Sequence, residues 1–173
     1  MSAVDENEPF VAALAEHKKI VYKVARLYCP NEADRQELTQ EIVIQLWRSF
    51  ARFDGRSKLS TWMYRVALNV AISWVRAERR HTRPTVPLDE ALLEPAPAAD
   101  AEMGALMAMV ARLGELDRAL VLLYVEGHGQ EAIGEILGIS TTNVSTRLGR
   151  VKERLRQQWD EAQKKETASD GHR

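Results

Sequence analysis

Residues 141–155, TTNVSTRLGRVKERL, combine hydrogen-bonding side chains with cations at helical spacing. At about 100° per residue, the apolar residues form one stripe: Val144, Leu148, Val151 and Leu155. The opposite face carries Thr142, Asn143, Thr146 and Arg150. Hydroxyl, amide and guanidinium groups bond to the edges of base pairs, and flanking cations reach phosphates. The pattern therefore favours contact with duplex DNA; the alternative is an ordinary amphipathic surface helix with solvated charges.

The preceding residues supply an element that could position this helix. The segment EAIGEILGIS, 131–140, has helical apolar spacing and ends in a short turn containing glycine. Ile133, Ile136 and Leu137 would pack on the apolar stripe, which predicts a helix-turn-helix. The predicted duplex contacts are Thr141, Thr142, Asn143, Thr146, Arg147, Arg150 and Lys152. A helix-turn-helix indicates DNA binding and does not by itself name a role.

A second candidate region, residues 54–80, interleaves aromatic rings with arginines in DGRSKLSTWMYRVALNVAISWVRAERR. Such rings suit single-stranded nucleic acid, because unstacked bases lie on them while cations hold the backbone. The same rings recur at helical spacing and could instead form a core. Composition does not separate these two interpretations.

The formal net charge of −1 hides a segregation of charge along the chain. Residues 48–83 hold nine Lys/Arg against two acids, a net of +7, and residues 140–156 hold five against one, a net of +4. Residues 84–139 hold ten acids against two arginines, a net of −8. Two basic regions separated by an acidic stretch suggest two contacts with polyanions.

Nothing in the sequence points to catalysis or to a bound metal. Cys29 is the single cysteine, and the four histidines are scattered, so we expect no disulfide, no metal site and no cofactor. Neither a phosphate-binding glycine loop nor a nucleophile–base motif is present, and we expect no enzyme activity.

Apolar spacing predicts three long helices over residues 10–29, 33–53 and 59–80 and shorter ones after residue 101, without strand alternation. Four of the six prolines fall within 84–97, which predicts a linker. The predicted fold is all-α, with two small helical domains joined by a Pro-rich acidic linker. The predicted boundaries are 1–83, a flexible linker at 84–101, 102–160, and a disordered tail at 161–173. No apolar run suits a membrane span or a signal peptide, so we expect no membrane insertion and a cytoplasmic location.

The order of these pieces resembles the extracytoplasmic-function (ECF) sigma factors of bacterial RNA polymerase, group IV of the primary sigma factor family. DRQELTQEIVIQLW, RFDGRSKLSTWMYRVALNVA, ISWVRAERR, the Pro-rich linker and AIGEILGISTTNVSTRLGRVKERL follow the order of that family's regions two and four. The resemblance extends from about Phe10 to Leu155.

The resemblance implies two sets of binding residues in the first domain. The set that docks on core RNA polymerase comprises Asp34, Glu37, Leu38, Gln40 and Glu41. Its acidic members share a helix face that suits a basic partner, although a solvated face is the alternative. The set for the melted minus-ten element comprises Arg56, Lys58, Trp62, Tyr64, Arg65, Asn69, Arg76, Arg79 and Arg80. An Asn offers a donor and an acceptor to a base edge, or it is merely an exposed polar group.

By this resemblance, the chain is expected to direct promoter-specific initiation with core RNA polymerase, duplex and single-stranded promoter DNA, and an anti-sigma factor as partners. The linker would enter the polymerase active-site channel or act as a plain tether. The alternative is a free-standing helix-turn-helix regulator. Three positions depart from the family. Met63 follows Trp62 where primary sigma factors have a second tryptophan, and Ala132 stands where the family often has an acidic residue. Gly134 replaces a frequent alanine, at a cost of about 1 kcal/mol of helix propensity.

Overall fold

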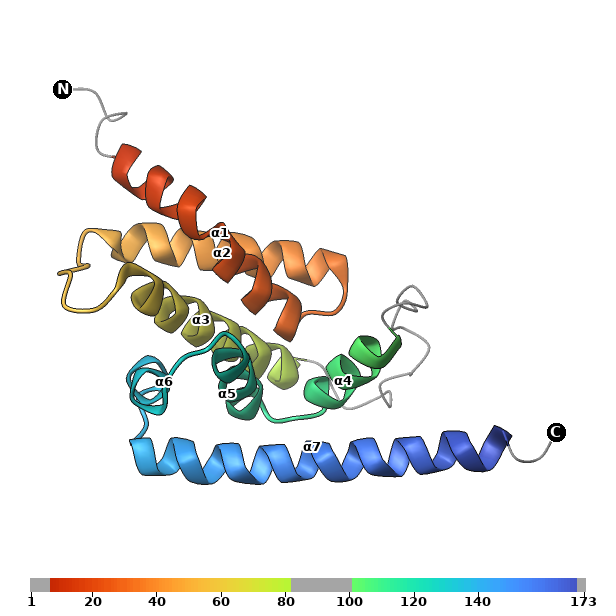
Figure 1. The fold of residues 1–173 in the computed structure, drawn as a ribbon. Coiled ribbons are helices and arrows are strands. Elements are labelled where there is room, and N and C mark those ends of the chain that lie inside the picture. The colour runs from red at the N-terminus through yellow and green to blue at the C-terminus, as the bar shows by residue number, and fades with distance from the viewer. Residues whose placement is uncertain (1–6, 82–100, 171–173) are drawn as a thin grey trace. The chain divides into compact units, whose positions relative to one another are not determined.

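The structure, a computed structural model, describes residues 7–81 and 101–170 (Figure 1). Within those two ranges it has seven helices and no strand. The chain divides into two compact units, Met1–Pro87 and Leu88–Arg173, which confirms the predicted all-α class with two helical domains. The predicted linker lies outside the described residues, apart from Ala101, where a helix begins.

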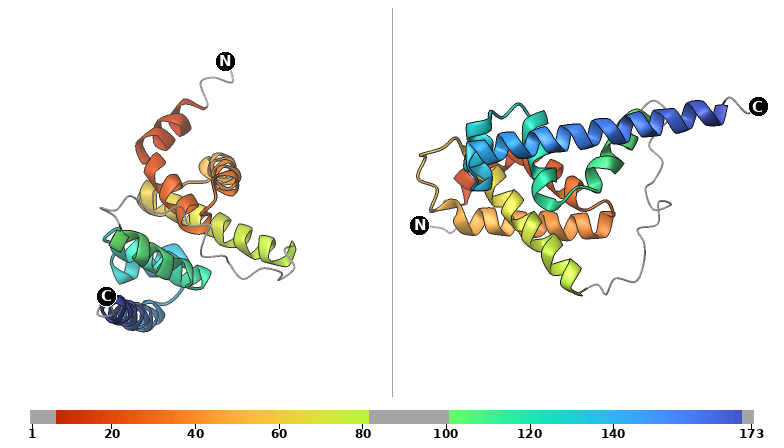
Figure 2. Two further views of the ribbon diagram at one scale, coloured as in Figure 1. Left: turned by 90° about the vertical axis from the view of Figure 1, so that its right-hand side faces the viewer. Right: turned by 90° about the horizontal axis from the view of Figure 1, so that it is seen from below.

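Unit 1 contains α1 (Glu8–Tyr28), α2 (Glu32–Phe50) and α3 (Leu59–His81), each packed on the other two (Figures 1 and 2). The chain is extended at Cys29, before Pro30, which ends α1 because a residue preceding proline avoids the helical conformation. Asn31 then caps α2, its Oδ1 accepting the Asp34 backbone N–H at 2.9 Å. The three helices agree with those predicted from apolar spacing.

The core of unit 1 follows from residues four apart on α2. Leu38, Ile42 and Leu46 are fully buried. The face of α3 that meets the other helices carries Met63, Tyr64, Ala67, Leu68 and Ala71. A second apolar cluster joins the start of α1, the end of α2 and the start of α3, with ring centroids 5.5 Å apart for Phe10–Phe50, 6.2 Å for Phe50–Trp62 and 5.3 Å for Phe53–Trp62. This aromatic cluster anchors both ends of the loop between α2 and α3.

Unit 2 contains α4 (Ala101–Ala111), α5 (Glu115–Val125), α6 (Gln130–Leu137) and α7 (Thr141–Asp170). The predicted apolar stripe of α7 is buried at Val144, Leu148 and Val151 and half-buried at Leu155. Among its predicted partners on α6, Ile133 and Ile136 are buried. The structure therefore has the predicted packing of two consecutive helices.

The turn between α6 and α7 depends on two glycines. Gly138 ends α6 with a φ of 68°, in the left-handed region that favours glycine. One helical turn earlier, a Cβ added to Gly134 would lie 2.7 Å from the Ile139 carbonyl oxygen. The turn folds back so closely that a side chain at position 134 has no room.

The helix α7 continues well beyond the predicted end of the domain at residue 160 (Figure 2). The sequence predicts a disordered tail from 161, whereas the structure is helical to Asp170. Side-chain pairs one turn apart support this helix: Arg156 lies 2.8 Å from Glu153 and 3.5 Å from Asp160. Hydrogen bonds from Arg156 and Gln157 hold the pKa of the Glu153 carboxyl below its ordinary value.

Candidate nucleic-acid interface

The first turns of α7 present the polar face that the sequence predicts. Ser140 caps the helix, its Oγ accepting the backbone N–H of Asn143 at 3.1 Å. Six predicted duplex contacts have exposed side chains: Thr141, Thr142, Asn143, Thr146, Arg150 and Lys152. Arg150 has no ion pair or hydrogen bond within the described residues. A guanidinium in this position is available for two hydrogen bonds to a guanine.

Two of the predicted duplex contacts have partners on α5: Arg147, which is half-buried, and Lys152, which is exposed. Both Nε and Nη2 of Arg147 lie 3.1 Å from Oδ1 of Asp117 on α5. The Lys152 ammonium lies over the ring of Tyr124, 3.8 Å from its centroid. Lys152 also lowers the pKa of Tyr124, first by hydrogen bonding and then by its charge. Sequence periodicity alone could not reveal either partner, since each lies more than twenty residues away.

In unit 1, the loop between α2 and α3 carries exposed cations. Arg56 forms a 3.0 Å ion pair with Asp54, and its side chain is 89% exposed. Asp54 Oδ1 also accepts the Arg56 backbone N–H at 3.1 Å, across Gly55 with its φ of 72°. Lys58 is exposed immediately before α3. An ion pair this exposed contributes little to stability, so the guanidinium is free to exchange its partner for a phosphate.

The aromatic residues of α3 do not all have the same environment. Some are exposed enough to stack on a base, and one packs in the core. Trp62 and Trp74 are half-buried, so part of each ring faces outward. Tyr64 is only 4% exposed, because it shares the core face of α3 with Leu68 and Ala71. Its ring is not available to stack on a base, and Tyr64 is a core residue. The remaining predicted residues of α3 lie at the surface: Arg65 is half-buried, while Arg76, Arg79 and Arg80 are exposed on its last turns.

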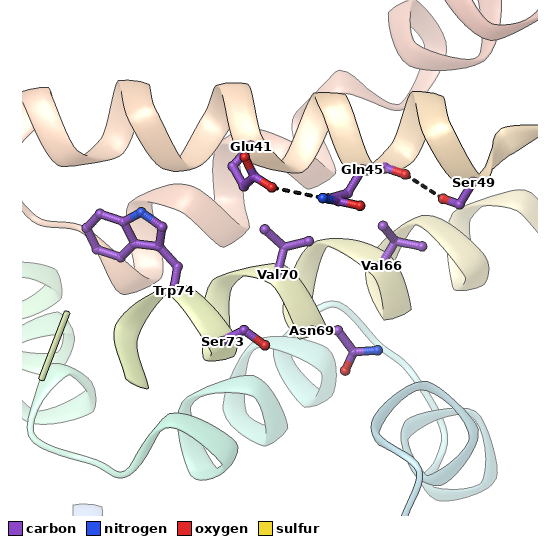
Figure 3. Close-up of a pocket in the computed structure, with 8 residues that line it drawn as sticks. All are labelled: Glu41, Gln45, Ser49, Val66, Asn69, Val70, Ser73 and Trp74. Carbon is purple, nitrogen blue, oxygen red and sulfur yellow. Dashed lines mark hydrogen bonds between the residues drawn. The ribbon is translucent and has the colours of Figure 1, made fainter. Parts of the chain in front are cut away.

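Asn69 is exposed on α3 and lines a groove between α2 and α3 (Figure 3). The groove is lined by Glu41, Gln45 and Ser49 of α2 and by Val66, Asn69, Val70, Ser73 and Trp74 of α3. On the α2 side, Gln45 Nε2 donates to Glu41 Oε1 at 2.9 Å. Asn69 has no hydrogen bond in the described part of the chain, so its amide is available to a ligand.

The predicted polymerase-docking residues of α2 have different environments. Glu37 and Gln40 are exposed, and Glu41 is half-buried at the groove. Asp34 accepts a hydrogen bond from the Asn31 side chain, which gives it a second role at the helix cap. Leu38 is fully buried and belongs to the core rather than to a docking surface. Its four-residue spacing with Ile42 and Leu46 is a sign of that burial that the sequence does contain.

Two exposed apolar residues on α2 are not among the residues predicted from the sequence. Ile44 is 40% exposed and Trp47 is 53% exposed, although both are large apolar side chains. Trp47 Nε1 donates to Asn7 Oδ1 at 3.1 Å, which fixes the indole beside the start of α1. Both residues continue the row of Glu37 and Gln40 at helical spacing, a signal that the sequence does contain. The exposed face of α2 is therefore acidic at one end and apolar at the other.

Neither a metal site nor a membrane span emerges from the described residues. Within ranges 7–81 and 101–170, no group of three His, Cys, Asp or Glu side chains is placed to hold a metal ion. Among the helices of those ranges, none is long and apolar enough to cross a membrane.

Comparison with known families agrees with this geometry. Residues 13–81 match the family model for Sigma-70 region 2, and residues 103–155 match the model for Sigma-70, region 4. The first match covers the three helices of unit 1, and the second runs from α4 into α7 through the helix-turn-helix. The chain belongs to the Sigma-70 family.

The curated relatives are ECF RNA polymerase sigma factors, and the chain belongs to this group. It is 30% identical to the ECF RNA polymerase sigma factor SigE of Mycolicibacterium smegmatis over 149 residues, which cover 82% of this chain and 58% of that protein. It is 26% identical to the ECF RNA polymerase sigma factor SigW of Bacillus subtilis over 168 residues, which cover 88% and 90%.

Solved structures share the fold of this ECF sigma factor. The sigma factor RpoE of Bartonella quintana, solved in complex with the anti-sigma factor NepR, superposes with a TM-score of 0.72 at 18% identity, covering 87% of this chain and 96% of RpoE. CnrH, solved with the cytosolic domain of CnrY, gives a TM-score of 0.66 at 22% identity and covers 89% of each chain.

Proposed function

We propose that this protein is the promoter-specificity subunit of a bacterial RNA polymerase. It binds the core enzyme, holds the minus-thirty-five element as a duplex through unit 2, and captures the opened minus-ten strand through unit 1. It performs no covalent chemistry itself. The observation that carries the proposal is the presence in one chain of a helix-turn-helix with an exposed polar face and a second helical unit with a cationic, partly aromatic surface.

Duplex recognition rests on the exposed face of α7. The threonines, Asn143 and Arg150 contact base edges or adjacent phosphates when the helix lies in the major groove. Arg154, exposed one turn after Arg150 and without an ion pair in the described residues, contacts the backbone. Arg147 and Lys152 contact α5.

Capture of the opened strand rests on the loop after α2 and on α3. Arg56, Lys58 and the arginines of α3 neutralise the backbone, and the outward part of Trp62 offers a surface for a base. The free amide of Asn69 bonds to one unstacked base. Opening the duplex exposes the base edges that were paired with the opposite strand. Unit 1 therefore recognises bases through edges that are inaccessible in the closed duplex.

Docking on the polymerase rests on the exposed face of α2. Glu37, Gln40 and Glu41 provide the acidic part of this surface, and Ile44 and Trp47 provide apolar area. Aromatic residues in the centre of an interface commonly carry much of the binding energy. RpoE, which has the same fold, was solved with an anti-sigma factor, and we propose a partner of that class for this chain. We place its action in the cytoplasm, where the polymerase works.

Multi-round transcription with purified core polymerase tests the proposal. Addition of the protein should produce transcripts that begin at a defined distance from a promoter sequence. A free-standing helix-turn-helix regulator would instead bind a duplex operator tightly without polymerase and would not confer promoter-dependent initiation on the core enzyme. That result would replace the proposal with this alternative.

A further inference from the structure

The helix α5 contacts α7 through two polar interactions that involve cations of α7. Asp117, near the start of α5, holds Arg147 with two nitrogen-to-oxygen distances of 3.1 Å. Tyr124, near the end of α5, lies under the ammonium of Lys152. Between them, Leu120 and Leu123 are fully buried and belong to the apolar core on which α7 packs.

The two cations lie on opposite sides of the buried stripe of α7. Arg147 and Lys152 are five residues apart, which places them about 140° apart around the helix axis. Val144, Leu148 and Val151 lie in the sector between them. Asp117 and Tyr124 are seven residues apart, or about 10 Å along α5, which is close to the diameter of a helix. The two contacts from α5 therefore reach α7 on both sides of its buried stripe.

This arrangement constrains rotation of α7 more than apolar packing alone. An apolar contact is non-directional, so a helix can roll on it without losing much buried area. The side chains of Arg147 and Asp117 are 36% and 25% exposed, so water screens their pair only in part, and two nitrogens of Arg147 contact the same oxygen. The contact of Lys152 with Tyr124 lies at the surface, where Tyr124 is 49% exposed. Rolling α7 in either direction would pull one cation away from its partner on α5.

We propose that Asp117 and Tyr124 are positioning residues that fix the rotation of α7 about its own axis, and that Arg147 and Lys152 serve this contact rather than binding phosphate. The inference rests on the proposed function of unit 2 in duplex recognition. Fixed rotation directs Thr142, Thr146 and Arg150 into the groove together. Arg147 and Lys152, which the sequence predicts as DNA contacts, thereby have a structural role.

Salt dependence separates the two roles of the cations. The holoenzyme, assembled from full-length protein and core polymerase, is titrated with a duplex carrying the minus-thirty-five element between about 50 and 200 mM salt. Arg154→Gln should lower the slope of log affinity against log salt by about one, because it removes a phosphate contact. Arg147→Gln and Lys152→Gln should leave the slope unchanged. A decrease of about one for both of these variants would overturn the inference.

Base preference tests the positioning role of α5. Asp117→Asn and Tyr124→Leu should each reduce discrimination between bases at the minus-thirty-five positions, by up to about tenfold, with no fall in the salt slope. Tyr124→Phe keeps the ring under the ammonium and should retain the preference. The exchange Asp117→Arg with Arg147→Asp should recover part of the lost preference. If the exchanged protein bound the duplex more weakly than Asp117→Arg alone and Arg147→Asp alone, Arg147 would be a phosphate contact and the proposal would be refuted. Unchanged base preferences in folded Asp117→Asn and Tyr124→Leu would also refute it.

A measurement without DNA distinguishes failure of this inference from failure of the proposed function. Urea unfolding of the wild type, Asp117→Asn, Arg147→Gln and the double variant gives the coupling between the two side chains. Coupling is expected whether or not the protein directs transcription, and its absence would refute the contact itself. If coupling is present but the wild-type holoenzyme has no minus-thirty-five preference, the proposed function fails, and with it the role in DNA positioning.

Discussion

At the scale of single residues, Gly134 illustrates how tertiary structure overrides helix propensity. Sequence analysis counts a glycine within a helix as a cost, and the family frequently has alanine at this position. In the structure, the Ile139 carbonyl oxygen occupies the place that a methyl group would need, 2.7 Å from the added Cβ. The close turn between α6 and α7 therefore favours glycine in this chain.

Gly134→Ala should destabilise unit 2 by about 1–3 kcal/mol, since the overpacking cost exceeds the gain in helix propensity. Gly149→Ala is a matched control within α7, because nothing lies within 4 Å of its added Cβ. That control should stabilise the protein by about 0.5–1 kcal/mol. Urea unfolding of both variants measures the difference. Equal stability of Gly134→Ala and the wild type would mean that the turn relaxes at no cost.

Single residues also show which features could be predicted from the sequence and which depend on the packing of distant helices. Spacing correctly identified the buried stripe of α7, because apolar residues repeat at the period of a helix. It did not separate Tyr64 from Trp62, since both are aromatic residues in one amphipathic segment, and only the packing of α1 and α2 on α3 decides which is buried. It also could not find the pair of Arg147 with Asp117, which depends on how α5 crosses α7.

At the scale of elements, α2 combines helix capping, core packing and an exposed acidic face. Glu37→Lys should weaken binding to core polymerase without loss of stability, because its side chain is exposed and outside the cap. Asp34→Lys should also destabilise the protein, since it removes the partner of Asn31 and places a cation at a helix N-terminus. Pull-down with core enzyme and thermal unfolding measure the two effects.

Glu16→Lys provides the matched control for this experiment, because it makes the same charge change on an exposed position of α1. It should leave core binding unchanged. If Glu37→Lys and Glu41→Lys both bound core polymerase as tightly as the wild type, the acidic face would be an ordinary solvated surface.

Helix ends were less predictable than helix positions. The predicted segments 10–29 and 59–80 agree closely with α1 and α3 because Pro30 and the loop before Leu59 interrupt the apolar period. The end of α7 was not predicted, because residues 161–170 lack an apolar stripe. The pairs of Arg156 with Glu153 and Asp160 support the turns just before this end, and Thr167 Oγ1 donates to the backbone carbonyl oxygens of Gln163 or Lys164 within it.

At the scale of the whole molecule, the fold divides into two units, each with its own core. The proline-rich, acidic composition between them predicts independent folding, although residues 82–100 lie outside the described part of the structure. Limited proteolysis should cut between Arg83 and Glu102 and leave two protected fragments. A single protected fragment that spans this interval would contradict independent units.

In the proposed function, the two units recognise different forms of DNA. Arg150→Ala should weaken discrimination at one minus-thirty-five position by about 1–3 kcal/mol, because it removes a two-pronged contact with a base pair. Asn69→Ala should relax the preference at one minus-ten base and slow open-complex formation while core binding stays intact, because its free amide faces an opened strand.

The most direct measurement is transcription by the holoenzyme from a library of promoters, together with a template premelted over the minus-ten element. We expect promoter-dependent transcripts with the wild type, altered preferences only upstream with Arg150→Ala, and altered preferences only in the melted segment with Asn69→Ala. If neither substitution changed any preference on either template, the division of promoter recognition between the two units would be contradicted.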